Sequence, residues 1–380
     1  MKKIFVGLLS LFFVAVACAP QAAPVPKPAA QPQTTLPSAQ VTAAPVSPGD
    51  QALSKLVEAA KKEGSVSLYS YNFIGDTALA MQRGFKDRYG INVDVITGRG
   101  SEFTERIRTE ARIGSRVGDF FEGSAAHVVN LKNLGLTVSL KDLPVLQENK
   151  DIWRLDPWFV DPDYNVLAAY PIFMQPFINT KLIKPEDEPK SWFDLLQPKW
   201  RGKIVFNDPL VSSTPHLVFQ PLVKAGILTE DYIAKLGAQD MIFVTGAPEA
   251  MERLARGEAP IFLWTQAGVA SNMVREGAPI KIIDFKEGIV GQAVTEAVVK
   301  DSPHPNAAKL FANWWLTKEG QTIFAKARGT STIRKDAPAD LPPALDVTPA
   351  KTIWVTAEDI DIQGKMFRDK VWVSLMKKGK

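Results

Sequence analysis

Cysteine and histidine are scarce in this chain of 380 residues. Cys18 is the only cysteine, so no disulfide can form within the chain and the fold must depend on its hydrophobic core. The three histidines, His127, His216 and His304, lie far apart and lack the spacing of a metal site. The sequence also lacks a G-x-S-x-G elbow, a phosphate-binding loop and an H-E-x-x-H motif. We therefore expect a protein without a cofactor that is not an enzyme.

Blocks of like charge and long apolar runs are missing after the N-terminal segment. The net charge of +4 is spread along the chain, apart from three lysines near the end, at 377, 378 and 380. Without a basic patch, nucleic acid is not an expected partner. No later segment offers the roughly 20 consecutive apolar residues that a membrane-spanning helix needs.

The N-terminal segment has the pattern of a secretory signal. Lys2 and Lys3 precede an apolar run over residues 4–17, and small residues lead into Cys18. This resembles the processing box of bacterial lipoproteins, in which the cysteine is lipidated, although Ala15 stands where that box usually has leucine. The resemblance implies a signal peptide over 1–17 and a lipid on Cys18. An ordinary signal peptide, with Cys18 incidental, is the alternative.

The next segment reads as a tether. Residues 18–48 consist almost entirely of Ala, Pro, Gln, Val, Thr and Ser, with one charge at Lys27. Such a composition cannot bury enough apolar surface to fold, so it predicts a disordered linker that would reach roughly 30 Å. A folded body on such a linker points to work outside the cytoplasm, next to a membrane.

The remaining body of about 330 residues is too long for one typical core and suggests two domains. Apolar periodicity predicts alternating strands and helices, first over 51–134 and again over 203–285. The order predicts an α/β fold of two doubly wound lobes joined by a hinge with two chain crossings. We expect lobe 1 to comprise 49–177 and 291–380, and lobe 2 to comprise 178–290. A final helix over 360–375 is expected to pack on lobe 1.

Ligands of such sheets bind where strands lead into helices, and the loops at those points share one chemistry here. Three loops offer glycines, hydroxyls and helix starts, which suit anions: 98–102 with Arg99 and Ser101, 123–125 with Ser124, and 212–215 with Ser212, Ser213 and Thr214. Arg99 adds a donor for carboxylate or phosphate. We predict that these loops form a ligand site, with Tyr69, Asn72, Trp264 and Gln292 as neighbours.

Each of these assignments has a structural alternative. A serine or threonine before a helix often only caps it, and Arg99 could pair with Glu102 or Glu105 instead. Trp264 could be a core residue. A rival function is a secreted hydrolase that uses Ser213 and His216, but no carboxylate is evident to orient the imidazole.

One motif is specific for a family. The segments Pro189–Leu196, Pro198–Ile204 and Asp208-Pro209 closely resemble the second-lobe entry of bacterial extracellular solute-binding proteins. The likeness is to the type II periplasmic-binding fold, in the branch with ferric-ion-binding components of ABC importers. It extends in order from about Gly64 to Ala327. Trp192 and Trp200 of this motif are expected to be structural anchors.

The chain departs from ferric-binding relatives at one point. Those relatives commonly carry adjacent tyrosines as iron ligands after the strand that matches 261–263, whereas this chain has Trp264-Thr265-Gln266. Direct iron binding by a tyrosine pair is therefore not expected. A small organic anion, a phosphorylated compound or chelated ferric iron fits the loops better.

The resemblance implies a monomeric receptor that captures its solute by hinge closure. Its partners would be a small, anionic ligand, the permease and ATPase subunits of an ABC importer, and the membrane through lipidated Cys18. Its location would be extracytoplasmic. A ligand-sensing input protein of a signalling system is a further alternative.

Overall fold

The computed structural model describes residues 48–209 and 214–356. These residues form a mixed sheet whose strands are β1 Ser65–Ser70, β2 Asn92–Thr97, β3 Phe120–Ser124, β4 Leu167–Asn179, β5 Ile204–Asn207, β6 Ile242–Val244, β7 Ile261–Thr265, β8 Ile280–Ile282, β9 Ile289–Val298 and β10 Thr352–Trp354. Most of these strands follow the periodicity of the sequence. The long strand β4 was not expected, because its continuous apolar run lacks the alternation of a half-buried strand.

The helices begin and end close to their capping signals. They are α1 Pro48–Glu63, α2 Gly75–Tyr89, α3 Gly100–Ile113, α4 Ala125–Asn133, α5 Thr214–Lys224, α6 Glu230–Gly237, α7 Ala247–Arg256, α8 Ser271–Arg275, α9 Pro305–Trp315 and α10 Lys318–Arg328. Short 3₁₀ helices link them at η1 Pro144–Gln147, η2 Lys150–Ile152, η3 Pro157–Phe159, η4 Pro185–Asp187, η5 Trp192–Leu196, η6 Pro198–Trp200 and η7 Ala267–Val269. Glycines in the left-handed conformation end α2, α3, α7 and α10, as expected for helix C-termini.

The sheet has the order β2-β1-β3-β9-β4-β7-β5-β6. In the β1 half, which contains β2, β1 and β3, all pairs are parallel, and the same holds in the β5 half, which contains β7, β5 and β6. Each half places its first strand between its second and third, with an antiparallel strand beyond the third: β9 next to β3, and β4 next to β7. The predicted doubly wound α/β fold is confirmed.

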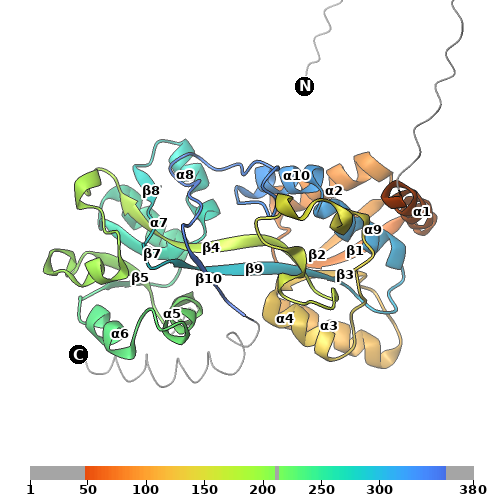
Figure 1. Cartoon of the computed structure of the whole chain (residues 1–380), viewed down its shortest axis with the longest axis horizontal. Helices are drawn as coiled ribbons and strands as arrows, with labels where there is room; N and C mark the ends of the chain where they lie inside the picture. Colours follow the sequence, from red (N-terminus) through yellow and green to blue (C-terminus); the bar gives the residue numbers. More distant parts are fainter. Residues whose placement is uncertain (1–47, 210–213, 357–380) are drawn as a thin grey trace, which may run out of the picture. The chain divides into compact units, whose positions relative to one another are not determined.

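Two long antiparallel strands, β4 and β9, connect the halves (Figure 1). β4 pairs with β9 over residues 167–174 and then with β7 and β8 over 175–179. The strand β10 adds a third segment, pairing parallel to β9 from Ile289 to Gly291. Trp354 lies against Gly291, where a Cβ atom would come within 2.9 Å of the indole ring.

Helices cover both faces of each half. In the β1 half, α2, α9 and α10 lie on one face and α3 and α4 on the other (Figure 1), and each layer encloses its own buried apolar cluster. In the β5 half, one cluster includes Trp192 and residues of α5 and α6, and another includes residues of α7. Trp192 and Trp200 are both buried, and the Trp192 indole donates to the Gly288 carbonyl at 2.9 Å.

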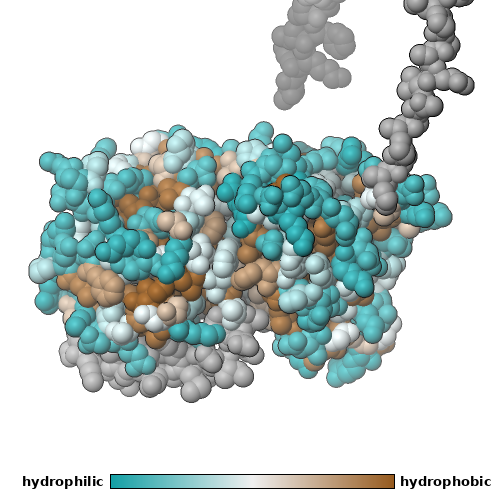
Figure 2. Space-filling view, viewed as in Figure 1, coloured by the Kyte–Doolittle hydropathy of each residue, from teal (hydrophilic) through white to brown (hydrophobic). Residues whose placement is uncertain are grey.

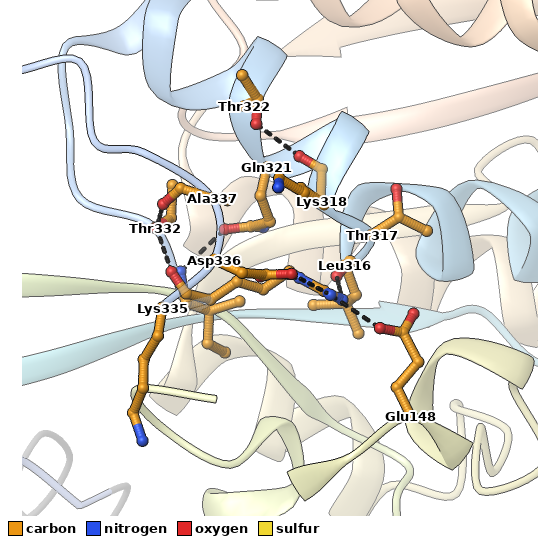
Figure 3. A network of polar contacts seen from close by, with 12 residues as sticks. Glu148, Leu316, Thr317, Lys318, Gln321, Thr322, Thr332, Lys335, Asp336 and Ala337 are labelled. Carbon is orange, nitrogen blue, oxygen red and sulfur yellow. Dashed lines mark hydrogen bonds and ion pairs between the residues drawn. The ribbon is translucent and has the colours of Figure 1, made fainter. Parts of the chain in front are cut away.

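The segment after α10 is fastened to the β1 half and then runs along the β5 half. The buried Arg334 side chain donates to Glu148 at 2.8 Å, to Asp336 at 2.8 Å and to the Leu316 carbonyl at 3.2 Å, within the polar network shown in Figure 3. Further on, Leu345 packs in an apolar cluster of the β5 half, whereas the sequence placed all of 291–380 with lobe 1. The expected helix over 360–375 lies outside the described residues.

One face of the molecule is mainly polar. Figure 2 shows hydrophilic residues over most of the visible face, with hydrophobic residues in separate patches. Within the described ranges, no helix combines the length and apolar character needed to cross a membrane. Cys18 lies outside those ranges, so its lipidation stays a prediction.

Candidate functional site

The strand order places a topological switch point between β1 and β3. The chain leaves β1 toward β2 on one side and reaches β3 on the other, and ligands of open α/β sheets bind beyond the carboxyl ends of strands at such points. The residues there are Ser70 at the end of β1, Tyr71 and Asn72 directly after it, and Glu122 to Ser124 at the end of β3. The β5 half has the equivalent point between β5 and β7.

Glu122 is the hydrogen-bonding centre of the β1–β3 switch point. Its side chain is fully buried and accepts hydrogen bonds from the Ser70 hydroxyl at 2.6 Å and from the Asn72 amide group at 2.5 Å. The backbone N–H groups of Tyr71 and Asn72 add two more, at 3.1 and 3.0 Å. The carboxylate therefore fixes the loop after β1. Sequence analysis missed this residue because it reads as part of a strand.

A second buried carboxyl group lies opposite the first. Glu296 on β9 is the direct antiparallel partner of Glu122, and its side chain is also fully buried. Neither of its oxygens has a hydrogen-bond partner among the described residues. Burial raises the pKa of both carboxyl groups, and the neighbouring Glu122 charge raises the pKa of Glu296 further.

Arg328 brings a positive charge to the same place. This half-buried residue ends α10, and its guanidinium donates to the Asn72 side-chain oxygen at 3.3 Å. No carboxylate in the described part of the chain lies within ion-pair distance of it. Burial and the Glu122 charge raise the pKa of the buried Tyr170 hydroxyl, and the neighbouring Arg328 guanidinium acts against them. An arginine without an acidic partner beside a hydroxyl and an amide group can bind an anion.

The sequence did not predict Arg328 as a site residue. A basic residue in the last turn of a helix is ordinarily explained by the helix dipole, so nothing in the local pattern marks this arginine. Only the fold brings it to Asn72, which is 256 positions away.

A pocket of about 320 Å³ opens where α3 and α4 begin. Ser101 and His127 are among the residues that line it, and Ser124 reaches it through a 2.8 Å contact between its hydroxyl and the His127 ring. A Cβ atom on Gly100 would lie 2.4 Å from that ring, so glycine is required there. Ser101 thus lines this pocket, and Ser124 contacts His127, another residue of its lining, while their part in ligand binding stays a prediction. The pocket is within the size range of small-molecule sites.

Arg99 and Tyr69 are placed differently. The Arg99 side chain is 83% exposed, and its nearest acidic partner is Glu102 at 4.0 Å. Ser101 does not cap α3, since the N-cap residue is Arg99 itself. Tyr69 is fully buried, donates to Glu110 and stacks on Phe103 with ring centres 4.8 Å apart, so its contacts are those of a core residue.

In the β5 half, the Trp264 ring is a core residue. It is fully buried and packs edge-on against Phe219 and Phe206, with ring centres at 4.8 and 5.3 Å. This favours the structural alternative over a stacking role. Its backbone has a φ of 51°, an unusual value for a bulky residue, at the point where the pairing of β7 with β4 shifts register.

Gln292, another residue of the predicted site, lies on β9 and is partly buried.

The remaining loop of the predicted site can be described only at its edges. Residues 210–213, with Ser212 and Ser213, lie outside the described ranges, and α5 begins at Thr214. The Asn207 side-chain oxygen, just before this loop, is buried and without a hydrogen-bond partner among the described residues. His216, on the first turn of α5, is buried.

Two glycines bring η7 and the end of α10 together. A Cβ atom on Gly268 would lie 2.7 Å from the Gly329 carbonyl oxygen and 3.2 Å from that of Arg328. Gly329 itself has a φ of 64° and lies against Ser271. The glycine at 268 therefore lets η7 lie close to the backbone of Arg328 and Gly329.

Comparison with known proteins identifies the family. Residues 130–361 match the family model of bacterial extracellular solute-binding proteins. The chain belongs to this family. It is 26% identical over 207 residues to a probable ABC transporter periplasmic-binding protein of Sinorhizobium fredii, covering 52% of each protein. The family consists of proteins that bind solutes outside the cytoplasm.

Solved structures share its fold. Iron-bound HitA from Pseudomonas aeruginosa superimposes with a TM-score of 0.61 at 20% identity, over 83% of this chain and 99% of that one. AfuA from Actinobacillus pleuropneumoniae, with fructose 6-phosphate bound, gives a TM-score of 0.56 at 19% identity, over 83% and 97%. These similarities confirm the type II periplasmic-binding fold of the solute-binding protein.

Proposed function

We propose that the solute-binding protein captures a small anion between its two halves and delivers it to the permease and ATPase subunits of an ABC importer. Closure of the halves over the ligand would favour the permease-docking state, because the ligand would contact both halves only in the closed form. In this proposal the halves act as the two lobes, the receptor is a monomer, and lipidated Cys18 holds it outside the cytoplasm at the membrane.

The position of Arg328 is the observation that supports an anion as the ligand. Its guanidinium is half-buried beside Asn72 and Tyr170, and no carboxylate of the described residues lies within ion-pair distance of it. An anion there would supply the missing counter-charge and accept up to two hydrogen bonds from one guanidinium. Ser101 and Ser124, at the starts of α3 and α4, would contact a larger ligand from the same end of the sheet.

Iron would enter only as a chelate with an anion. Within residues 48–209 and 214–356, no three His, Cys, Asp or Glu side chains gather as they would around a metal ion. Ala267 and Gly268, which follow β7 and its Thr265-Gln266, also offer no phenolate oxygen. Ferric citrate, a phosphorylated compound and a small carboxylate are therefore the candidate solutes.

A thermal-shift screen tests the class of ligand. The purified protein would be heated with inorganic phosphate, citrate, ferric citrate or fructose 6-phosphate, and with spermidine as a cationic comparison. A bound ligand at about 100 times its Kd stabilises the folded state by about 2.7 kcal/mol. We expect stabilisation by at least one anion and none by spermidine. Stabilisation by spermidine alone would contradict the proposal.

Substitution of Arg328 tests the site. Arg328→Gln should weaken binding of the stabilising anion by about 10- to 100-fold, because a charge-assisted hydrogen bond contributes about 1.5–3 kcal/mol. Arg88→Gln is the matched control, since Arg88 is an exposed arginine that pairs with Glu319 on the surface. Unchanged affinity in Arg328→Gln, measured by calorimetry, would show that the anion binds elsewhere.

A further inference from the structure

The two buried carboxyl groups of β3 and β9 form a pair in which simultaneous ionisation is unfavourable. Glu122 and Glu296 occupy directly opposite positions in the antiparallel ladder, and both side chains are fully buried. Side chains in such positions have Cβ atoms about 4.5–5.5 Å apart, and like charges there repel each other strongly when water is excluded. The pair therefore binds its first proton at a higher pH than an exposed carboxyl group does.

The hydrogen bonds show which group keeps the charge. Glu122 accepts four hydrogen bonds from donors of the loop after β1, which is the pattern of an ionised carboxylate. Glu296 accepts none from the described residues, so no donor compensates a charge on it. Burial and the Glu122 charge raise the pKa of Glu296, while the hydrogen bonds from Ser70 and Asn72 lower that of Glu122 against the effect of burial. The proton accordingly belongs on Glu296.

The pair is electrostatically linked to the anion site. Asn72 connects them, because its side-chain nitrogen donates to Glu122 and its side-chain oxygen accepts from Arg328. The other titratable groups that act here are the hydroxyl of Tyr170 on β4 and that of Tyr71 in the loop after β1. Arg328, at the end of α10, is the positive charge that acts on Tyr170. Since Asn72 alone separates it from Glu122, a positive charge at this position would favour the ionised form of the Glu122 carboxyl group.

We propose that Glu122 and Glu296 share one proton that resides on Glu296, that ionised Glu122 positions Asn72 toward the ligand, and that anion binding at Arg328 raises the fraction of molecules in which this one proton is bound. A bound anion neutralises the guanidinium that stabilised the ionised carboxylate, so the pair holds a proton more tightly in the complex. Affinity then falls as pH rises through the range in which the pair titrates. Glu122 is a positioning residue, and this inference rests on the proposed capture of an anion.

The carboxyl pair can be tested without any ligand. Exposed carboxyl groups are ionised at neutral pH, so infrared spectroscopy of the ligand-free protein should show a protonated buried carboxyl as a separate C=O band. We expect this band in the wild type at pH 7 and its loss in Glu296→Gln, whose amide resembles the protonated acid and preserves the fold. Glu319→Gln, at an exposed position, is the matched control and should keep the band. A wild type without the band, or its persistence in Glu296→Gln, would overturn the pair.

The link to binding is tested with phosphate, citrate and fructose 6-phosphate as separate probes. Isothermal titration in buffers of different ionisation heat gives the number of protons taken up per anion bound. We expect a fraction of one proton in the wild type and close to none in Glu296→Gln. Anion binding without proton uptake in the wild type would overturn the linkage. If none of the probes bound, the proposed function would fail, while the infrared result would still decide whether the pair exists.

The positioning role of Glu122 has its own readout. Glu122→Gln should weaken anion binding about tenfold and lose the proton uptake together, because the new amide cannot accept all four hydrogen bonds of the loop. Glu296→Gln should keep the affinity of the wild type at low pH. Equal affinity in Glu122→Gln and the wild type, with the fold confirmed by circular dichroism, would overturn the positioning role.

Discussion

Three ionisable residues of the β1 half are buried or half-buried, and each would destabilise the fold if it were charged there without a compensating neighbour. A fully buried carboxylate such as Glu122 is tolerated because four donors surround it, while Glu296 is tolerated by holding a proton. Arg328 stays half-buried without an acidic partner among the described residues. The same burial that makes these groups costly for stability makes them responsive to ligand and to pH.

The raised pKa values predict how stability depends on pH. A carboxyl group with a raised pKa in the folded state binds a proton more readily there than in the unfolded chain. Its contribution to stability is therefore complete below the ordinary carboxyl pKa and is lost as pH rises through the raised value. Glu296→Gln should show a smaller loss of unfolding free energy than the wild type between pH 5 and 8. Urea titrations over this range measure it, and parallel pH profiles would contradict the prediction.

Arg334 is a residue whose role is stability. Its buried guanidinium bonds Glu148, Asp336 and the Leu316 carbonyl, so Arg334→Ala leaves three acceptors without their donor (Figure 3). Because both carboxylates are partly exposed, we expect a loss of about 2–3 kcal/mol in unfolding free energy. Lys335→Ala, next to it and exposed, should change the free energy by no more than about 0.5 kcal/mol. Equal urea midpoints for the two variants would disprove the assignment.

Elements meet most closely where η7 approaches the C-terminus of α10. Gly268 and Gly329 allow backbone to touch backbone there, next to the proposed anion site. The strand β10 adds a third segment beside β4 and β9, with its indole ring over Gly291. Closure of the halves, as proposed, would have to preserve or re-form these contacts.

Gly268→Ala tests the importance of this approach. The new methyl group would lie 2.7 Å from the Gly329 carbonyl oxygen, so η7 and α10 would have to separate. If anion capture needs this contact, affinity should fall about tenfold, which corresponds to about 1.4 kcal/mol. Gly237→Ala is the control, since a Cβ atom there meets nothing within 4 Å. Calorimetry compares the two variants, and equal affinities would show that closure does not depend on the contact.

At the scale of the whole molecule, the family of the folded body agrees with the export and anchoring signals that the N-terminal sequence predicts. The body belongs to the extracellular solute-binding family, and the sequence before it has the pattern of a signal, a lipidation site and a tether. A tethered receptor would remain near its transporter while its folded body samples solute. Tether and receptor should then be separable parts.

Cys18→Ser tests this separation. Without the thiol no lipid can be attached, so the variant should leave the membrane fraction and incorporate no labelled palmitate, while binding of the stabilising anion stays unchanged. Ser38→Ala, in the predicted tether, is the control and should stay with the membrane. A Cys18→Ser protein that remains in the membrane fraction would show that another feature anchors it.

Local patterns predicted most of the elements but little of the site. Helix starts and C-terminal glycines were readable because caps and apolar periodicity act within a few residues. Ser101 and Ser124 were predicted as site residues for the same reason, since each stands at a helix start, and that assignment stays a prediction. Trp264 and Tyr69 were placed in the predicted site by their position at strand ends, but sequence position could not tell which side of the sheet each ring faces.

The sequence by itself determined the alternation of strands and helices, its repetition in two parts of the chain, and the family. These three features depend on local periodicity and on contiguous motifs. Only the tertiary structure decided which charged and polar side chains lie next to each other. Arg328 reaches Asn72 across 256 positions, and Glu122 faces Glu296 because β3 happens to pair with β9 in this register. The physical reason is that pKa, burial and anion affinity depend on neighbours in space, which strand pairing and helix packing bring together from distant parts of the chain.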